Sequence, residues 1–413
     1  MDEVDALIVG AGPAGSTAAA RLSARGHRVL VIEEHGTVGQ PVQCAGLVSR
    51  RVLDLAGSTS MVRAPVRGAA VFGPSLGDIT FRAAEPRAFA IDRAGLDVYL
   101  ADRAAKAGAT VETGTRFDGL SGPVDRRAMA HLTSVHGGTR EVAAKLIIGA
   151  DGVTSAVARA FRLRRPVEIL PAFEAEYGKS PGDPELVEVY LGRRFAPGLF
   201  GWWIPDGSGG ARIGIAADAD GTSAREYFGR LVTQVERRFG RSLPPPVSYL
   251  ASGIPIGAVP RTSGPRVLLV GDAAAQVKPL SGGGIFTGMR CAEIAADVAD
   301  RALRADDLSA HALSAYEHAW RAEFGEEFRR ALYLRRVFTR LSDRDLDALI
   351  AALKGGRLAE TIVAFGDIDF PTHVARELLR ESPALVRLLP KALGAWMGSD
   401  AYRVPPLDPP RRK

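Results

Sequence analysis

Residues 6–15 read ALIVGAGPAG, an apolar run that passes directly into a glycine-rich turn. An alanine-rich stretch of helical character follows to about Arg25, and a second apolar run covers residues 28–33. The order strand, turn, helix, strand is that of a βαβ unit. Gly10, Gly12 and Gly15 allow a tight turn and let the backbone approach a pyrophosphate at the helix N-terminus. These residues predict a dinucleotide-binding domain, and the alternative is a glycine turn with a structural role.

The residues around these glycines support the same prediction. Pro13 and Ala14 complete the turn, and Glu33 closes the second strand 18 residues after Gly15. A carboxylate at this place can accept hydrogen bonds from the hydroxyls of a ribose. We therefore expect Glu33 to bind the cofactor together with residues 10–15.

Two later segments favour a flavin over a nicotinamide cofactor. An Asp after the apolar run 266–270 can bind a ribityl chain, and the glycine-rich residues 279–284 precede a helical run. The N-terminus of such a helix offers free N–H groups and a positive dipole to the N1/O2 edge of a flavin, which favours its reduction. The alternative is a capped turn before an amphipathic helix. The residues expected to contact the cofactor here are Gly271, Asp272, Pro279, Gly283, Gly284 and Ile285.

A third segment, residues 149–155, follows the apolar run 145–149, and its Asp151 can also be read as a helix cap. In this order, the three motifs resemble the FAD-binding pattern of the para-hydroxybenzoate hydroxylase-like flavoprotein superfamily over about residues 1–300. The resemblance implies that FAD is the cofactor. It also implies that Arg93, Phe117 and Asp151 bind it.

Within that superfamily, two local segments resemble the geranylgeranyl reductase family. Residues 41–47, PVQCAGL, resemble its cysteine-bearing loop beside the isoalloxazine, and residues 278–284 resemble its flavin-side glycine stretch. Residues 197–205, PGLFGWWIP, fit its P-x-x-Y-x-W-x-F-P element except that Phe200 replaces Tyr, which removes a hydroxyl, and Ile204 replaces Phe. Residues 365–371 resemble the start of its C-terminal helical part. The resemblance places Cys44, Ala45 and Gly46 at the flavin, and Phe200, Trp202 and Trp203 at the substrate.

The same resemblance implies an FAD-dependent reductase that saturates C=C bonds of a geranylgeranyl or polyprenyl chain. Such a chain is carried by an isoprenoid lipid, a prenyl diphosphate, a chlorophyll precursor or a quinone tail. Trp202 or Trp203 would stabilise developing positive charge, and Cys44 or a nearby water would supply a proton. Cys44 can instead be a small buried hydrophobe. Adjacent strand residues point to opposite faces, so we expect at least one of the two tryptophans to belong to the core.

Other functions use the same fold and remain open at this point. A flavin monooxygenase is the main alternative, and an electron-transfer flavoprotein is another. A halogenase shows a W-x-W-x-I-P element, but it also needs an early lysine, and this chain has none before Lys106. The sequence contains one dinucleotide fingerprint and so leaves the electron donor open between NADPH, ferredoxin and another donor.

Composition excludes several classes of protein. The 413 residues are 46% hydrophobic and 24% charged with a net charge of +6, as in an ordinary globular chain. Without a long basic tract we expect no nucleic-acid partner. Two cysteines, an acidic start and interrupted apolar runs predict a cytoplasmic protein without a membrane span. Nothing in the sequence indicates a metal site.

The fold class expected is α/β (α+β), with a Rossmann-type FAD-binding domain interrupted by an antiparallel-sheet substrate domain. The FAD-binding domain would comprise residues 1–65, 88–165 and 250–308, and the substrate domain residues 66–87 and 166–249. Residues 309–404 form a C-terminal helical region, and 405–413 a tail. The leucines and basic residues of 345–397 predict helices that cover the core or, as the alternative, contact a membrane surface peripherally.

Overall fold

The computed structural model describes residues 2–166, 168–218, 220–354, 358–374 and 377, and their strands form three sheets. The eight-stranded sheet consists of β1 (Asp2–Val9), β2 (Val29–Ile32), β8 (Thr110–Glu112), β9 (Thr115–Leu120), β10 (Ala128–Ser134), β11 (Thr139–Gly149), β17 (Ser263–Gly264) and β18 (Val267–Leu269). Its main path runs β17, β18, β11, β1, β2, β8, and β10 joins β11 to β9. β1 pairs in parallel with both β11 and β2, as the βαβ pattern predicts.

Side chains alternate along the strands of this sheet, so each strand contributes to two faces. α1 (Pro13–Ser23) and α6 (Ile285–Arg304) cover one of these faces. Ala6 and Ile8 pack toward α1 and α6, whereas Leu7 and Val9 pack on the opposite face with residues of β9, β10 and α4 (Ala156–Ala160). α3 (Arg93–Lys106) lies beside α1 and begins where the Asp92 side chain accepts a hydrogen bond from the Gly95 N–H at 2.8 Å. The dinucleotide-binding turn therefore lies between β1 and a helix that is packed on both sides.

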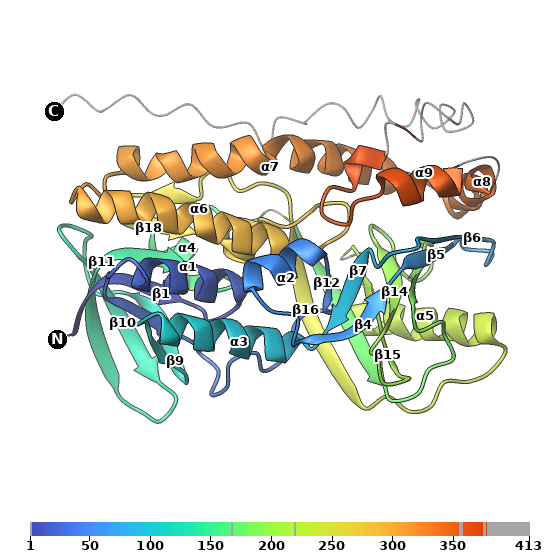
Figure 1. Ribbon diagram of the computed structural model, residues 1–413, viewed down its shortest axis with the longest axis horizontal. Helices are drawn as coiled ribbons and strands as arrows, with labels where there is room; N and C mark the ends of the chain where they lie inside the picture. Colours follow the sequence, from blue (N-terminus) through green and yellow to red (C-terminus); the bar gives the residue numbers. More distant parts are fainter. Residues whose placement is uncertain (1, 167, 219, 355–357, 375–376, 378–413) are drawn as a thin grey trace.

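A second, seven-stranded sheet lies at the other end of the molecule (Figure 1). Its strands, in spatial order, are β16 (Ser248–Ile256), β12 (Glu168–Tyr177), β15 (Ala211–Ala216), β14 (Phe200–Pro205), β13 (Leu186–Tyr190), β5 (Gly68–Phe72) and β6 (Asp78–Arg82). All pairs are antiparallel except β13 with β5. α5 (Ala224–Phe239) covers one face through Phe228, Leu231 and Val235. The opposite face meets the first sheet and its loops.

A small third sheet connects the two larger ones. It contains β3 (Leu47–Val48), β7 (Ala88–Ile91) and β4 (Val62–Val66), with β7 in the middle. α2 (Arg50–Ala56) follows β3, and the short 3-10 helix η1 (Gly271–Ala274) follows β18. The loop before β3 is the cysteine-bearing segment, so this sheet places that loop between the two larger sheets.

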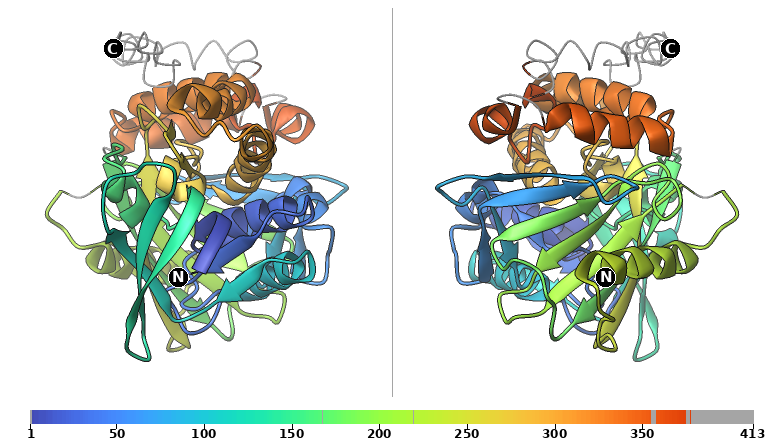
Figure 2. Two further views of the ribbon diagram at one scale, coloured as in Figure 1. Left: turned by 90° about the vertical axis from the view of Figure 1, so that its left-hand side faces the viewer. Right: turned by 90° about the vertical axis from the view of Figure 1, so that its right-hand side faces the viewer.

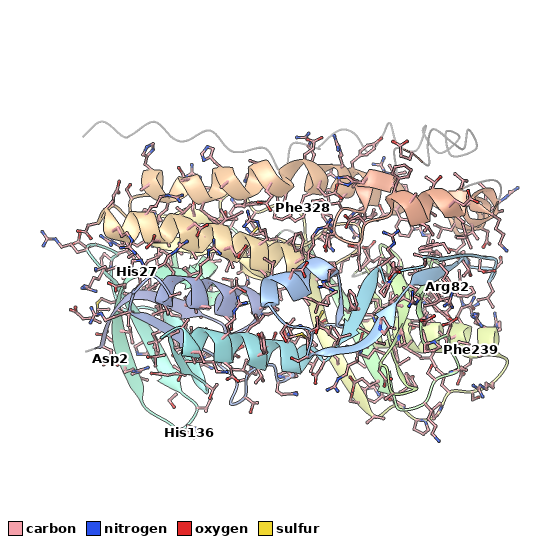
Figure 3. All side chains as sticks on the ribbon, in the orientation of Figure 1. Asp2, His27, Arg82, His136, Phe239 and Phe328 are labelled. Atoms are coloured by element: carbon pink, nitrogen blue, oxygen red, sulfur yellow. The ribbon has the colours of Figure 1, made fainter. Side chains whose placement is uncertain are left out.

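Three further helices lie on one side of both sheets: α7 (Ala310–Phe338), α8 (Asp343–Leu353) and α9 (Leu358–Phe365) (Figures 1 and 2). α7 runs along α6. Its Phe328, labelled in Figure 3, is fully buried in the core cluster that also contains residues of α6. α8 and α9 contact β6. No helix among the described residues is long and apolar enough to cross a membrane.

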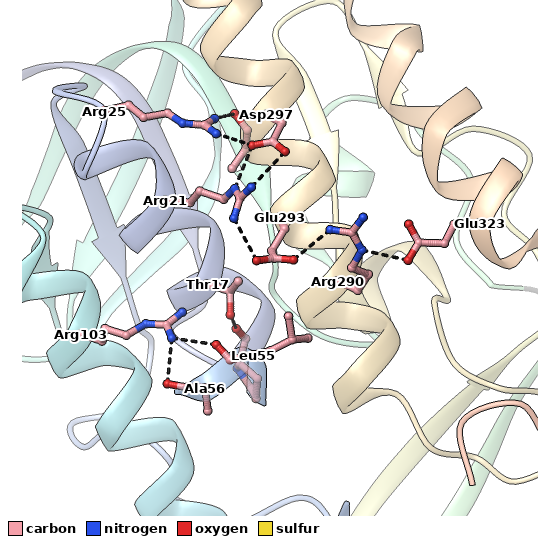
Figure 4. A network of polar contacts seen from close by, with 12 residues as sticks. Thr17, Arg21, Arg25, Leu55, Ala56, Arg103, Arg290, Glu293, Asp297 and Glu323 are labelled. Atoms are coloured by element: carbon pink, nitrogen blue, oxygen red, sulfur yellow. Dashed lines mark hydrogen bonds and ion pairs between the residues drawn. The ribbon is translucent and has the colours of Figure 1, made fainter. Parts of the chain in front are cut away.

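Ion pairs connect α1, α6 and α7 (Figure 4). Arg21 contacts Glu293 at 2.9 Å and Asp297 at 2.8 Å, and Arg290 connects Glu293 to Glu323 of α7 at 3.0 and 2.8 Å. Single exposed pairs contribute little to stability, but here each acidic group of α6 is shared in a network. The network fixes the helix of the glycine turn to the helix that begins at the second glycine stretch.

The fold class predicted from the sequence is confirmed, including the Rossmann-type sheet, the antiparallel sheet and the C-terminal helices. One expected boundary needs correction. Residue 250 lies inside β16, which pairs with β12 from Ser248 to Ile256, so the chain leaves the second sheet later than expected. Gly253 and Pro255 lie inside the strand, whereas the turn follows it at Gly257, which has φ +93°. The expected helices beyond residue 377 and the tail 405–413 lie outside the described residues.

Candidate functional site

The three motif glycines at the N-terminus have different roles. Gly10 has φ +101°, and a Cβ on it would collide with the Ala150 carbonyl, while a Cβ on Gly15 would collide with the carbonyl of Gly10. Both positions therefore need glycine for packing. A Cβ on Gly12 would meet no protein atom within 4 Å. Gly12 is also the N-cap of α1 and offers no side-chain cap, so the helix N-terminus is open to an anion.

Glu33 is held at this turn by hydrogen bonds. Its Oε2 accepts a hydrogen bond from the Ala11 N–H at 3.0 Å, and its Oε1 lies 2.6 Å from Nδ1 of His35. The carboxylate is thus fixed beside the helix N-terminus, where the sequence predicts the ribose contact. Pro13 is the first residue of α1, and Ala14 packs against the position of Gly271.

The second glycine stretch meets the first through η1. Gly271 has φ +64°, and Asp272 Oδ1 lies 3.1 Å from the position that a Cβ on Gly284 would take. Burial raises the pKa of Asp272 to about 6, although Arg93 opposes the shift. α6 begins at Ile285 without a side-chain cap at Gly284. A buried carboxyl and an open helix N-terminus therefore lie side by side.

The loop that contains Pro279 is closed on itself and fastened from outside. The Lys278 N–H donates to the Gly283 carbonyl at 3.0 Å, and the Gly282 N–H donates to the Lys278 carbonyl at 2.9 Å. Nζ of Lys278 donates to the Ile368 carbonyl at 2.7 Å and lies 3.1 Å from Asp369. The segment after α9 therefore holds the loop in place, a contact that the sequence did not reveal.

Arg93 lies between Cys44, Asp97 and Asp272. It forms an ion pair with Asp97 one turn along α3. Burial lowers the pKa of Arg93, but Asp97 and Cys44 raise it, so the net pKa is above the ordinary value. Within the described part of the chain, its buried Nε has no hydrogen-bond partner. Such a donor is expected to find a partner in a ligand or a water molecule.

The cysteine-bearing loop is shaped by Gly46. The Gly46 N–H donates to Sγ of Cys44 at 3.5 Å, and Gly46 has φ +67°. A Cβ on Gly46 would collide with the guanidinium of Arg212, which comes from β15. Ala45 packs in an apolar cluster with Trp202 and other residues of the second sheet. The loop is therefore enclosed between Arg93 on one side and β14–β15 on the other.

The two adjacent tryptophans of β14 point to opposite faces. Trp202 and Phe200 lie on the face toward the first sheet, and their rings meet edge to face with centroids 6.4 Å apart. Trp203 is 1% exposed, packs with the α5 residues and donates to Ser180 Oγ at 2.6 Å. α5 covers the face of the sheet on which Trp203 lies, and a contact between Trp203 and the substrate stays a prediction. The prediction that one tryptophan belongs to the core agrees with this arrangement.

Phe117 and Asp151 have internal partners. Phe117 is 3% exposed in the core on the face of the first sheet that α1 does not cover. Asp151 accepts hydrogen bonds from the Ser155 hydroxyl at 2.7 Å and from the Val157 N–H at 3.0 Å. Asp151 thus stabilises the start of α4, which was the alternative reading of its motif. FAD binding by these two residues stays a prediction.

The open N-termini of α1 and α6, the space at Gly12 and the unpartnered donor of Arg93 fit a dinucleotide that carries a flavin. The family described as "FAD binding domain" matches residues 3–175. The fold and this match define an FAD-dependent oxidoreductase of the para-hydroxybenzoate hydroxylase-like type.

Comparison with related sequences and structures defines the family more closely. Digeranylgeranylglycerophospholipid reductase 2 of Methanothermobacter thermautotrophicus is 35% identical over 93% of this chain and 98% of its own. The corresponding reductase of Methanocaldococcus jannaschii is 33% identical over 85% and 91%. A geranylgeranyl bacteriochlorophyll reductase-like protein of Thermoplasma acidophilum has a TM-score of 0.83 and 26% identity, over 95% of this chain and 100% of that one. The chain belongs to the geranylgeranyl reductase family of digeranylgeranylglycerophospholipid reductases.

More distant structures share the fold alone. A flavin-dependent brominase has a TM-score of 0.69 with 16% identity, over 92% of this chain and 98% of that one. Because this similarity is confined to the fold, it adds no argument for halogenation.

Several site residues were not predicted from the sequence. These are Asp97, Glu174, Arg212 and Lys278, and all four side chains are buried. The sequence gave no clear signal for Glu174, since Glu168 and Glu176 share its alternation along the strand with the apolar Leu170 and Ala172. A carboxyl on an apolar strand face is unexpected unless it has a partner.

Proposed function

We propose that this protein is an FAD-dependent reductase that saturates C=C bonds in the geranylgeranyl or longer polyprenyl chain of an isoprenoid lipid. The observation that carries the proposal is the identity of 35% to a digeranylgeranylglycerophospholipid reductase over nearly the whole of both chains. The row of Phe200, Trp202 and Ile204 beside the cysteine-bearing loop supports it, because this face suits an apolar chain.

FAD, when bound and reduced, supplies a hydride, and a proton from another source completes the addition of two hydrogens to the alkene. We assign FAD contacts to residues 10–15, Glu33, Arg93, Asp272 and the start of α6. An isolated alkene has no polar handle, so aromatic and apolar side chains must hold it. In this proposal Trp202 holds the reacting segment, and Cys44 or a water beside it provides the proton.

The electron donor and the cellular site also belong to the proposal. NADPH or ferredoxin is the expected donor, in keeping with the single dinucleotide fingerprint at residues 10–15. We place the protein in the cytoplasm at the surface of a membrane, since an isoprenoid lipid is presented there.

The decisive experiment is anaerobic turnover of digeranylgeranylglycerophospholipid, geranylgeranyl diphosphate and a prenylated quinone with dithionite as the reductant. The expected result is a mass gain of two hydrogens for each double bond reduced in at least one of them. In air, with a physiological reductant, a reductase consumes no oxygen in step with product, whereas a monooxygenase adds an oxygen atom. Oxygen insertion, or no mass gain with any of the three, would refute the proposal.

The two tryptophans provide a matched pair of variants for this assay. Trp202→Ala should increase partly saturated products, because the indole lies on the face toward the cysteine-bearing loop. Trp203→Ala should lower stability and leave the pattern of reduced bonds unchanged, because its indole is buried under α5. An unchanged product pattern in Trp202→Ala would remove the local support for the proposed substrate face.

A further inference from the structure

A row across the second sheet joins Trp202 to a buried carboxyl. Trp202 of β14 is paired with Gly214 of β15, and Gly214 is paired with Glu174 of β12. The three residues therefore lie side by side and share one face of the sheet. Nε1 of Trp202 donates to Oε2 of Glu174 at 2.6 Å, so the indole crosses a whole strand to reach its partner.

Gly214 makes this crossing possible. A Cβ on Gly214 would lie 2.5 Å from Cζ2 and 2.9 Å from Nε1 of Trp202. Any other residue at position 214 would displace the indole from the sheet surface. Two contacts thus fix one orientation of the indole ring. Gly214 leaves room for the ring against the sheet surface, and Glu174 binds its Nε1.

The surroundings of Glu174 leave it few polar contacts. It is 2% exposed, and Leu170 and Ala172 extend its face toward the first sheet. The charged groups that act on it are Arg212 of β15 and Glu176 of its own strand. Arg212 donates to the Ile91 carbonyl at 3.2 Å and lies against Gly46 in the cysteine-bearing loop. A carboxyl in this place costs stability that an apolar residue would not cost, which indicates a role that needs it.

We propose that Glu174 is a positioning residue: by holding the Trp202 indole flat across Gly214, it sets where along a prenyl chain reduction takes place. This inference rests on the proposed function and deepens it. The indole N–H is only a donor, and a carboxyl oxygen accepts its bond whether the acid is ionised or neutral. Glu174 therefore transfers no proton in this role, and an amide of the same shape should replace it.

The test compares variants that separate acceptor from charge. Glu174→Gln keeps an acceptor oxygen, Glu174→Leu removes it, and Trp202→Phe removes the donor. Glu188→Leu is the control, because Glu188 is equally buried but bonds to Tyr190 and Arg238 on the α5 face. Each FAD-loaded variant is assayed for kcat, KM and the distribution of reduced double bonds.

We expect Glu174→Leu and Trp202→Phe to lower kcat at least about tenfold, with similar increases in partly reduced products, because a small misplacement of the reacting group is costly. The double variant should be no worse than either single one, since both act through one contact. Glu174→Gln should restore the product distribution, and Glu188→Leu should leave it as in the parent. Additive losses, or a Gln variant as impaired as the Leu variant, would overturn the proposal.

A substrate-free measurement separates this inference from the proposed function. The near-ultraviolet circular dichroism of Trp202, obtained as parent minus Trp202→Phe, should be lost in Glu174→Leu and retained in Glu174→Gln. If no prenyl compound is reduced but this signal behaves as expected, the proposed function fails and the positioning contact stands. If the signal is unchanged in Glu174→Leu, the positioning inference fails whatever the substrate.

Discussion

Replacing Glu174 by Gln should change how the stability of this protein depends on pH. Glu174 is 2% exposed, and burial raises its pKa to about 7 from an ordinary value of 4.5, although the Trp202 hydrogen bond and Arg212 oppose the shift. The native protein therefore holds a proton at this site in the range where the unfolded chain has released it. Gln has no proton to release, so the variant lacks this linkage.

The sign and size follow from the two pKa values. Between about pH 4.5 and pH 7 the native state binds more protons than the unfolded state, so this group makes stability fall as pH rises. Above about pH 7 both states are ionised and the penalty is constant. A difference of roughly 2.5 pKa units corresponds to about 3 kcal/mol, of which about 2.5 kcal/mol develops between pH 5 and pH 8.

The assay is urea unfolding of parent and Glu174→Gln, both saturated with FAD, at about pH 5 and pH 8. A constant cost of the amide cancels when the change with pH is compared between the two proteins. The parent should lose about 2 to 3 kcal/mol more than the variant from the lower to the higher pH. Glu188→Gln is a second test, because burial also raises the pKa of Glu188, and it should weaken the pH dependence in the same direction. Equal pH dependence in parent and Glu174→Gln would refute a raised pKa at this site.

Gly12→Val should fold, because a Cβ there meets no protein atom, but it should purify without FAD, because the side chain would occupy the space expected for the pyrophosphate. Gly229→Val, equally open on α5, is the control and should stay yellow. FAD retained in Gly12→Val would disprove the pyrophosphate contact. Cys44→Ser should keep FAD and reduce prenyl substrates at least about tenfold more slowly if the thiol takes part in proton transfer, and unchanged turnover would make it a packing residue. Asp369→Asn should destabilise the protein by about 3 kcal/mol in thermal or urea unfolding, because it leaves Lys278 buried with a weaker partner, and a loss below about 1 kcal/mol would contradict this.

The fold was predictable because its signals are local. The βαβ unit shows itself through an apolar strand, glycines that permit one turn and a helix that starts at Pro13, all within residues 6–33. The start of α3 is likewise a local feature, because the side chain of Asp92 directly before it accepts a hydrogen bond from the Gly95 N–H. Such features depend on sequence neighbours and not on the rest of the chain.

The junction between the sheets was not predictable in the same way. That Trp202 faces the cysteine-bearing loop and Trp203 faces α5 depends on which strands pair and in which register. Alternation shows that the two rings diverge but not which face each one takes. The hydrogen bond from Trp202 to Glu174 links residues that are 28 positions apart in the sequence. Gly214, which lies between them in the sheet, is part of no motif.

Buried cations are a common feature of the loops that flank the proposed flavin site. Arg93 contacts Cys44, Arg212 lies on Gly46, and Lys278 closes the second glycine stretch. Arg93 is paired with Asp97 of its own helix, whereas the carboxylates near Arg212 and Lys278, Glu174 and Asp369, come from other elements. Loops held in this way are preorganised, and the uncapped N-terminus of α6 favours negative charge on a bound ligand. Because a reduced flavin can be anionic at its N1/O2 edge, this arrangement would stabilise the reduced cofactor, consistent with a reductase.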